Sequence, residues 1–207
     1  MCGFRIFARP ESARADSGLA HNLSVRAPAP PYSGEGPHAL WHVSEDTSIE
    51  RFEPRVSSTV ERDEACVWAI DTRHLPMYWF PRDCPRGTFW TTPETTAEDA
   101  ERLLGGASRV HAVEGTWLDR MRTARVVAYR LPAETFAPDP KVGGYWLSAG
   151  PVEPREIVEL GCLVARHAEA GIELRIVENL WPLWDRIIAS TLEFSGMRLR
   201  NAQRRPG

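Results

Sequence analysis

Hydrophobic and polar positions alternate in short runs through the middle of the chain, which predicts an array of β-strands. The runs are a few residues long and are separated by glycine, proline, aspartate and threonine, which favour turns. Before residue 150 the pattern predicts six strands, at 40–44, 65–71, 87–91, 109–114, 125–131 and 145–148.

Three segments between these strands predict helices. The aromatic stretch 74–80 contains one proline and precedes another, and it predicts a short helix that packs on the sheet. Thr95 and Glu98 have the spacing of a capping box, so a helix is expected up to the glycine pair at 105–106. Residues 116–122 predict a helical turn.

Helical periodicity becomes stronger after residue 150. Residues 154–170 predict an amphipathic helix that begins at a proline and ends before Gly171. Alternation returns over 172–177 and predicts a strand, and 180–194 predict a second helix rich in tryptophan, leucine and isoleucine. The C-terminal part of the chain is therefore expected to be mainly helical.

These elements predict an α+β fold, with a mixed or antiparallel β-sheet core, flanking helices and a C-terminal helical segment. Proline and glycine crowd the end of residues 1–38, so this segment is interpreted as an N-terminal extension that is peripheral or poorly ordered. Residues 39–202 are expected to form a single domain, and residues 203–207 a tail.

Composition narrows the class of protein. No apolar run reaches the roughly 18 residues that cross a bilayer, so no membrane segment is expected and a cytoplasmic location is predicted. The net charge of −3 does not indicate a nucleic-acid partner. The cysteines and histidines have no metal-ligand spacing, so no metal is expected.

The first predicted strand ends in His42-Val43-Ser44, which carries two hydrogen-bonding side chains on one face. His42 and Ser44 can therefore grip one ligand together. The alternative is a histidine at a strand end that binds a backbone carbonyl. Both interpretations are open at this point.

The run Pro-Arg-Asp-Cys-Pro-Arg at 81–86 is the most distinctive short segment. Its prolines stiffen a loop in which Arg82 and Arg86 can present guanidinium groups to a phosphate. Alternatively Asp83 pairs with one of these arginines and closes the loop. Cys84 has no adjacent histidine in the sequence to activate it as a nucleophile.

The strands LWHVS and VWAID and the segment HLPMYWF resemble the opening of the ADP-ribosyltransferase fold. That superfamily has a split β-sheet core and uses NAD as a co-substrate. The chain also resembles an uncharacterised bacterial family whose members carry the motifs FPRDCPR, NLWPLWD and STLEFS, over about residues 39–202.

The superfamily resemblance implies roles for particular residues. His42 would contact the ribose on the nicotinamide side with support from Ser44, and Tyr78 or Trp68 would stack on nicotinamide. The last core strand should carry an acid, but this chain has Tyr145 there. Glu193 is a candidate replacement carboxylate, and in a polar C-terminal cluster with Arg198 it is alternatively a structural residue.

Three hypotheses follow from the sequence. The first is an enzyme that binds NAD or a related nucleotide in a cleft beside His42 and transfers ADP-ribose with loss of nicotinamide. The second is a nucleotide-binding or interaction module without catalysis, which the missing acid favours. The third is a phosphotransferase-like enzyme in which arginines handle a phosphate, namely Arg82, Arg86 or Arg198. The ligand class is a nucleotide or small molecule, and the residues do not identify an acceptor.

Overall fold

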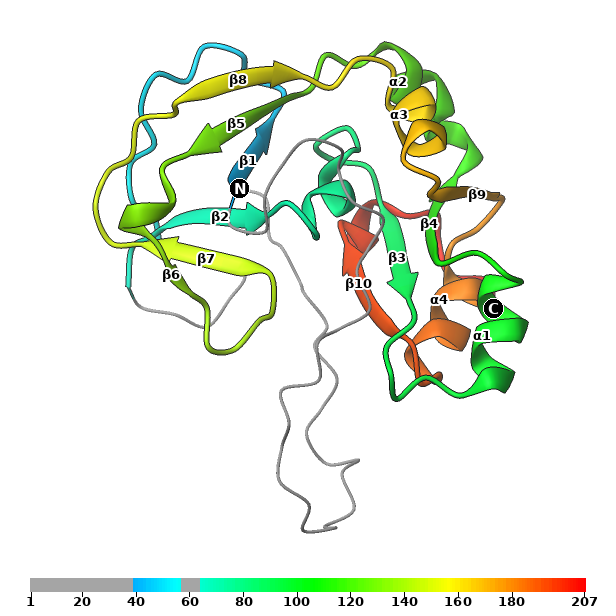
Figure 1. Cartoon of the computed structure of the whole chain (residues 1–207). Helices are drawn as coiled ribbons and strands as arrows, with labels where there is room; N and C mark the ends of the chain where they lie inside the picture. The colour runs from blue at the N-terminus through cyan, green and yellow to red at the C-terminus, as the bar shows by residue number, and fades with distance from the viewer. Residues whose placement is uncertain (1–38, 57–63) are drawn as a thin grey trace, which may run out of the picture.

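A computed structural model describes residues 39–56 and 64–207, so the N-terminal extension expected at 1–38 lies outside the described residues. The described chain forms two β-sheets that lie side by side (Figure 1). The first sheet has the strand order β6-β7-β2-β1-β5-β8, and all its strand pairs are antiparallel. Its strands are β1 (Leu40–Ser44), β2 (Val67–Asp71), β5 (Val127–Leu131), β6 (Ala137–Pro138), β7 (Tyr145–Ser148) and β8 (Glu156–Glu159).

The second sheet has the strand order β10-β3-β4-β9. Its β4–β9 pair is parallel and its other pairs are antiparallel. Its strands are β3 (Arg86–Trp90), β4 (Arg109–Glu114), β9 (Glu173–Val177) and β10 (Glu193–Met197). Strands and helices both contribute substantially, so the predicted α+β class is confirmed.

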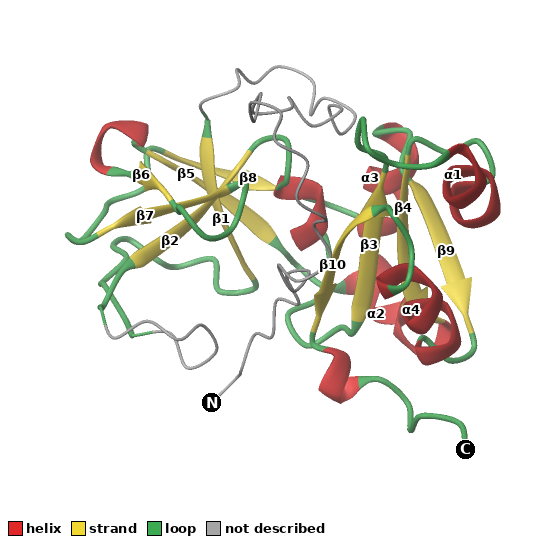
Figure 2. Cartoon of the chain, turned by 90° about the horizontal axis from the view of Figure 1, so that it is seen from below, coloured by secondary structure: helices red, strands yellow, loops and turns green. Residues whose placement is uncertain are grey.

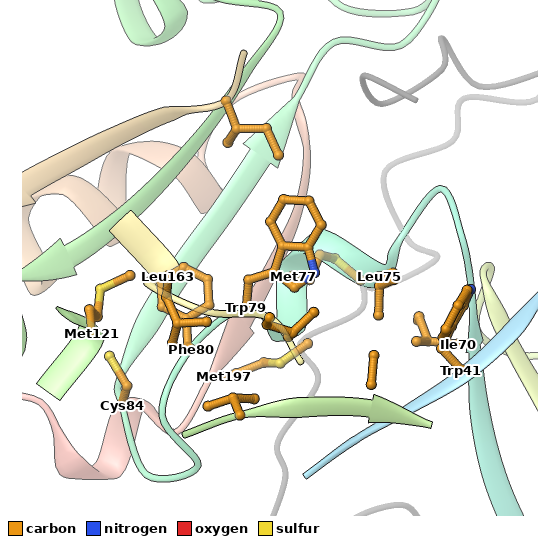
Figure 3. Close-up of a cluster of buried hydrophobic side chains, with 14 of the residues drawn as sticks. Trp41, Ile70, Leu75, Met77, Trp79, Phe80, Cys84, Met121, Leu163 and Met197 are labelled. Atoms are coloured by element: carbon orange, nitrogen blue, oxygen red, sulfur yellow. The ribbon is translucent and has the colours of Figure 1, made fainter. Parts of the chain in front are cut away.

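Alternation along the strands divides the apolar side chains into three buried layers. Trp41 belongs to the layer shared by the two sheets, whereas its neighbour Leu40 belongs to a layer on the outer face of the first sheet. In the second sheet Trp90 faces the shared layer and Phe89 faces outward. We call the shared layer the inter-sheet core. Figure 3 shows part of it, from Trp41 to Met121.

Helices cover the second sheet (Figure 2). Side chains of α1 (Ala97–Leu104) and α4 (Trp181–Ile188) form the layer on its outer face, while α2 (Leu118–Thr123) and α3 (Leu163–Glu169) contribute to the inter-sheet core. The short 3-10 helix η2 (Leu75–Tyr78) contributes Leu75 and Met77 to the inter-sheet core, where the aromatic segment predicted a short helix packed on the sheet. Among the described residues, no helix has the length and apolar character needed to cross a membrane.

Two predicted C-terminal helices were wrong in part. Residues 154–170 contain strand β8 before helix α3, because Glu156–Glu159 pair with β5 and Gly161 then turns the chain at a positive φ of 66°. Residues 180–194 contain only α4, which ends at Ile188, and then enter β10. Pairing with distant strands overrides the helical pattern in both segments.

Smaller boundaries also shift. The N-cap of α1 is Thr96, whose hydroxyl accepts a hydrogen bond from the Asp99 amide at 3.2 Å, so the capping box predicted at Thr95 is one residue early. Strand β6 was not predicted because two residues carry no alternation.

A buried carboxylate fixes the C-terminal tail. Glu114 Oε1 accepts hydrogen bonds from the Leu180 amide and the Gln203 amide, both at 3.1 Å. The Gln203 carbonyl accepts a third bond, from Trp181 Nε1 at 2.8 Å. The start of the tail at 203–207 is therefore docked against α4.

A histidine pair links the second sheet to α3 inside the inter-sheet core. His167 Nδ1 lies 2.7 Å from the Leu163 carbonyl, so it carries the proton, and Nε2 must accept from His111 Nδ1 at 2.9 Å. Both rings are fully buried. Burial lowers the pKa of His167 to about 4 and lowers the pKa of His111 well below its ordinary value, with the nearby Arg109 charge acting in the same direction.

Acid should therefore destabilise the fold through this pair. The unfolded state binds protons below about pH 6.5, whereas folded His167 stays neutral down to about pH 4, so stability is lost as pH falls through this window. Urea denaturation at pH 7 and pH 4 should show a loss of roughly 3 kcal/mol from His167 alone. The double variant His111→Phe/His167→Leu should lose most of this dependence. An unchanged pH slope in that variant would contradict the assignment.

Candidate functional site

Three aromatic side chains named by the sequence meet at one end of the inter-sheet core. The hydroxyl groups of Tyr78 on η2 and Tyr145 on β7 are 2.7 Å apart and hydrogen-bonded. Trp68 on β2 packs edge-on against Tyr145, with ring centroids 6.1 Å apart. Trp68 and Ile70 share one face of β2, and Ile70 is the register partner of Tyr145, which brings the three rings together.

Both phenols are neutral. Burial raises the pKa of Tyr78, and burial followed by the neighbouring Tyr78 raises the pKa of Tyr145 well above its ordinary value. The pair offers one hydroxyl proton and several lone pairs, but no negative charge. Tyr145 therefore does not substitute electrostatically for a carboxylate.

Arg86, the first residue of β3, lies against these rings with only 3% of its surface exposed. Its guanidinium carbon is 5.7 Å from the centre of the Tyr78 ring. Its three nitrogen groups donate to neutral acceptors: the Met77 carbonyl, the Cys84 carbonyl and Met197 Sδ, each at 3.0 Å. The positive charge is thus buried against dipoles and π faces.

Arg198 brings a second buried guanidinium to the same place. It directly follows β10 and has a φ of 56°, which makes it the one non-glycine residue with a positive φ in the described chain. Such a conformation costs about 1–3 kcal/mol and persists where the surroundings enforce it. Burial lowers the pKa of Arg86 most, and the charge of Arg198 lowers it further, so the two cations lie within each other's field.

The Arg82 backbone ties the loop 81–86 to both sheets. Its carbonyl accepts from Arg198 Nε at 3.0 Å, and its amide donates to Glu45 Oε1 at 3.0 Å, just after β1. The Arg82 side chain is exposed and makes no hydrogen bond or ion pair with another described residue, although its charge acts on His42 and Asp46. The Arg82 backbone therefore contacts Arg198, and the Arg82 side chain is available to solvent.

His42 lies on the other face of the first sheet. Its ring packs on Phe52 in the outer layer with centroids 4.7 Å apart, whereas Tyr145 lies in the inter-sheet core. His42 Nδ1 is 3.1 Å from the Trp68 carbonyl, so this nitrogen is the donor and Nε2 carries the lone pair. Burial is the main cause that lowers the pKa of His42, and the charges of Arg82 and Arg55 lower it further. The alternative role as a carbonyl-binding strand-end histidine is therefore observed.

Three further candidates add no reactive side chain to the cluster of aromatic residues and arginines. Ser44 accepts a hydrogen bond from the Asp46 amide at 3.1 Å and so shapes the turn after β1. Glu193 is paired with Trp90, at the opposite end of β10 from Met197, roughly 13 Å along the strand. Burial raises the pKa of the Cys84 thiol to about 12, which excludes a thiolate nucleophile at neutral pH.

Glu45 is a residue of this region that sequence reasoning missed. Its carboxylate accepts from the Arg82 amide and from Arg120 Nη2 at 3.2 Å, so it joins β1, the loop 81–86 and α2. The sequence feature that could have identified Glu45 is its position directly after the His-x-Ser segment.

The surface hollow that the structure shows lies away from the cluster, and the described residues contain no group suited to a metal ion. An open surface hollow of about 670 Å³ lies elsewhere, between residues 47–50 and 154–157. No group of three or more histidine, cysteine, aspartate or glutamate side chains suited to a metal ion occurs within 39–56 and 64–207. The chemistry available at the cluster is thus aromatic stacking, hydroxyl hydrogen bonding and positive charge.

Comparison with known proteins identifies one family. The model of a family of unknown function, DUF6886, matches residues 41–202, and the chain belongs to this family. The expected membership of an uncharacterised family is therefore confirmed. No curated protein and no solved structure matches the chain.

The tyrosine pair predicts strong coupling in a double-mutant cycle. Tyr78→Phe or Tyr145→Phe leaves the other buried hydroxyl without its partner and should cost about 1–3 kcal/mol, whereas removing both hydroxyls should cost less than the sum. Chemical denaturation of the four proteins measures the coupling. Tyr78→Phe with Tyr129→Phe, whose hydroxyl binds the Asp46 carbonyl instead, should be additive and serves as the control. Additivity of Tyr78 and Tyr145 would contradict a direct bond.

Proposed function

We propose that this member of an uncharacterised family is an ADP-ribosyltransferase-like protein that binds NAD or a related nucleotide at the cluster of Trp68, Tyr78 and Tyr145 with Arg82, Arg86 and Arg198. One observation carries the proposal. Arg86 and Arg198 are buried side by side, and Arg86 hydrogen-bonds only neutral acceptors. A phosphate group would compensate the positive charge of Arg86.

The diphosphate of the nucleotide would lie near Arg82, because this arginine is exposed and its backbone is fixed by Arg198 and Glu45. Guanidinium groups bind phosphate oxygens in a planar, two-pronged geometry, which favours arginine over lysine here.

The flat ring of the nucleotide would pack against the aromatic side chains. Trp68 and Tyr78 are both partly exposed, so each has surface available for a ligand. Stacking of a base on an aromatic ring contributes about 1–3 kcal/mol. His42 would act from the opposite face of the sheet, where its bond to the Trp68 carbonyl positions this strand.

Binding is better supported than turnover. Departure of nicotinamide develops positive charge on the ribose, which a nearby carboxylate normally stabilises. The neutral Tyr145 hydroxyl provides no such charge, and Glu193 is at the far end of β10. A nucleotide-binding module without catalysis is therefore the second candidate, and ADP-ribosyl transfer would require an acid from a partner or substrate.

Nucleotide binding can be measured by isothermal titration calorimetry with NAD and ADP-ribose. Arg82→Gln should weaken the affinity about 10-fold, because a charge-assisted hydrogen bond is worth roughly 1.5 kcal/mol. Its fold should be unchanged, since the side chain is exposed. Arg122→Gln is the matched control, because Arg122 is an exposed arginine that pairs only with Asp119 on the same helix. Absence of binding, or equal weakening in both variants, would overturn the proposal.

Turnover is a separate measurement. Incubation with NAD and chromatography of released nicotinamide should show no release above a heat-inactivated sample if the chain only binds. Release that disappears in Arg82→Gln and persists in Arg122→Gln would instead establish cleavage of NAD at this site, with ADP-ribose passing to water or to an acceptor. Tyr145→Phe would then test whether the phenol takes part.

A further inference from the structure

A third buried arginine, Arg109, lies at the opposite end of the second sheet. It is the first residue of β4 and is paired with Trp90, the last residue of β3. Arg86 is the first residue of β3, so roughly 13 Å of strand separates the two ends. The Arg109 side chain has no exposed surface.

Only one edge of this guanidinium is used. Nη1 donates to the Arg73 carbonyl at 3.0 Å, while Nε and Nη2 are buried and have no hydrogen-bond partner among the described residues. Nε and the Nη2 group lie on the same side of a guanidinium and form the fork that binds two oxygens of one carboxylate or phosphate. The unused edge is thus the one built for a two-oxygen anion.

Two neighbouring side chains, Trp90 and His74, also carry buried nitrogens that have no hydrogen-bond partner among the described residues. The Trp90 ring lies under the guanidinium, 4.6 Å from its carbon, and Trp90 Nε1 is a buried donor that also lacks a partner within the described chain. The His74 ring is 5.9 Å from the Trp90 ring, and its buried Nε2 has no partner among the described residues. Because Nδ1 binds Asp71 Oδ1, Nε2 of the neutral ring is an acceptor and gives an anion no donor. Gly144 permits this packing, because a Cβ there would lie 2.3 Å from His74 Nδ1.

Nearby charges do not neutralise Arg109. Burial lowers its pKa to about 9, and the charges of Arg73 and Asp71 act on it in opposite directions. Asp71 is the carboxylate of the group, but its Oδ1 already accepts from the His74 amide at 2.9 Å and contacts His74 Nδ1 at 2.7 Å. Buried charged groups are normally paired, so an unpaired guanidinium fork is unusual.

We propose that the Arg109 fork, stacked on the Trp90 ring, is a second anion-binding site that holds a carboxylate or phosphate group of a small molecule. It differs from the nucleotide site in the strand ends that form it and does not depend on that proposal. Because the fork is closed to solvent, the anion is bound during folding or after a local opening of the turn 72–74, and its exchange is slow.

The test uses the full chain, refolded from urea into phosphate, acetate or chloride at equal ionic strength. Thermal unfolding should show a melting temperature about 3 °C higher in phosphate or acetate than in chloride. Arg109→Met should remove this difference and should melt in chloride at the same temperature as the parent or higher, because an unpaired buried charge has been replaced by an apolar side chain. Arg82→Gln should keep the difference, which separates this site from the nucleotide site.

The indole signal of Trp90 reports the site directly. In a nitrogen-15 correlation spectrum, the Nε1–H peak that disappears in Trp90→Phe should shift between chloride and the effective anion. This measurement decides the question even if Arg109→Met fails to fold. An unshifted Trp90 peak, or a stabilisation that persists in Arg109→Met, would overturn the proposal.

Discussion

Guanidinium groups buried between two β-sheets set the main constraint on this molecule. Arg86 and Arg109 face the inter-sheet core from opposite ends of the second sheet, and both are almost completely enclosed. Removing a charge from water costs several kcal/mol unless dipoles or counter-charges replace the solvent. Backbone carbonyls, aromatic faces and a thioether supply this replacement for Arg86, which fixes η2, the loop 81–86 and the end of β10 around one side chain.

The buried guanidinium charge is compensated differently at the two ends of the second sheet. At the Arg86 end all three guanidinium nitrogens of Arg86 are hydrogen-bonded, and the charge of Arg198 acts on this side chain. At the Arg109 end the charge is single, but one edge of the guanidinium has no protein acceptor in the described part of the chain. We proposed a nucleotide for the first end and a single carboxylate or phosphate for the second, because each would compensate a buried guanidinium. The inter-sheet core therefore combines apolar packing with buried positive charge at both ends of the second sheet.

Much of the candidate site was predicted from residue types because local rules constrain them. The stiff loop with Arg82 and Arg86, the aromatic segment containing Tyr78 and the tyrosine at the expected position of an acid were all recognised from the sequence, and the structure brings them together. His42 was expected beside them. However, successive side chains along β1 point to opposite faces of the sheet, and this alternation decides which face His42 occupies. That position places it with Phe52 on the outer layer, because Trp41 takes the inner face.

By itself the sequence determined the α+β class, most strands before residue 150, the aromatic helix and the family. Alternation and turn residues act locally, so these features can be read along the chain. Only the tertiary structure decided that Glu156–Glu159 and Glu193–Met197 are strands, since they gain their hydrogen bonds from β5 and β3. It also decided the partners of the arginines, because burial and a counter-charge depend on residues brought from distant parts of the chain.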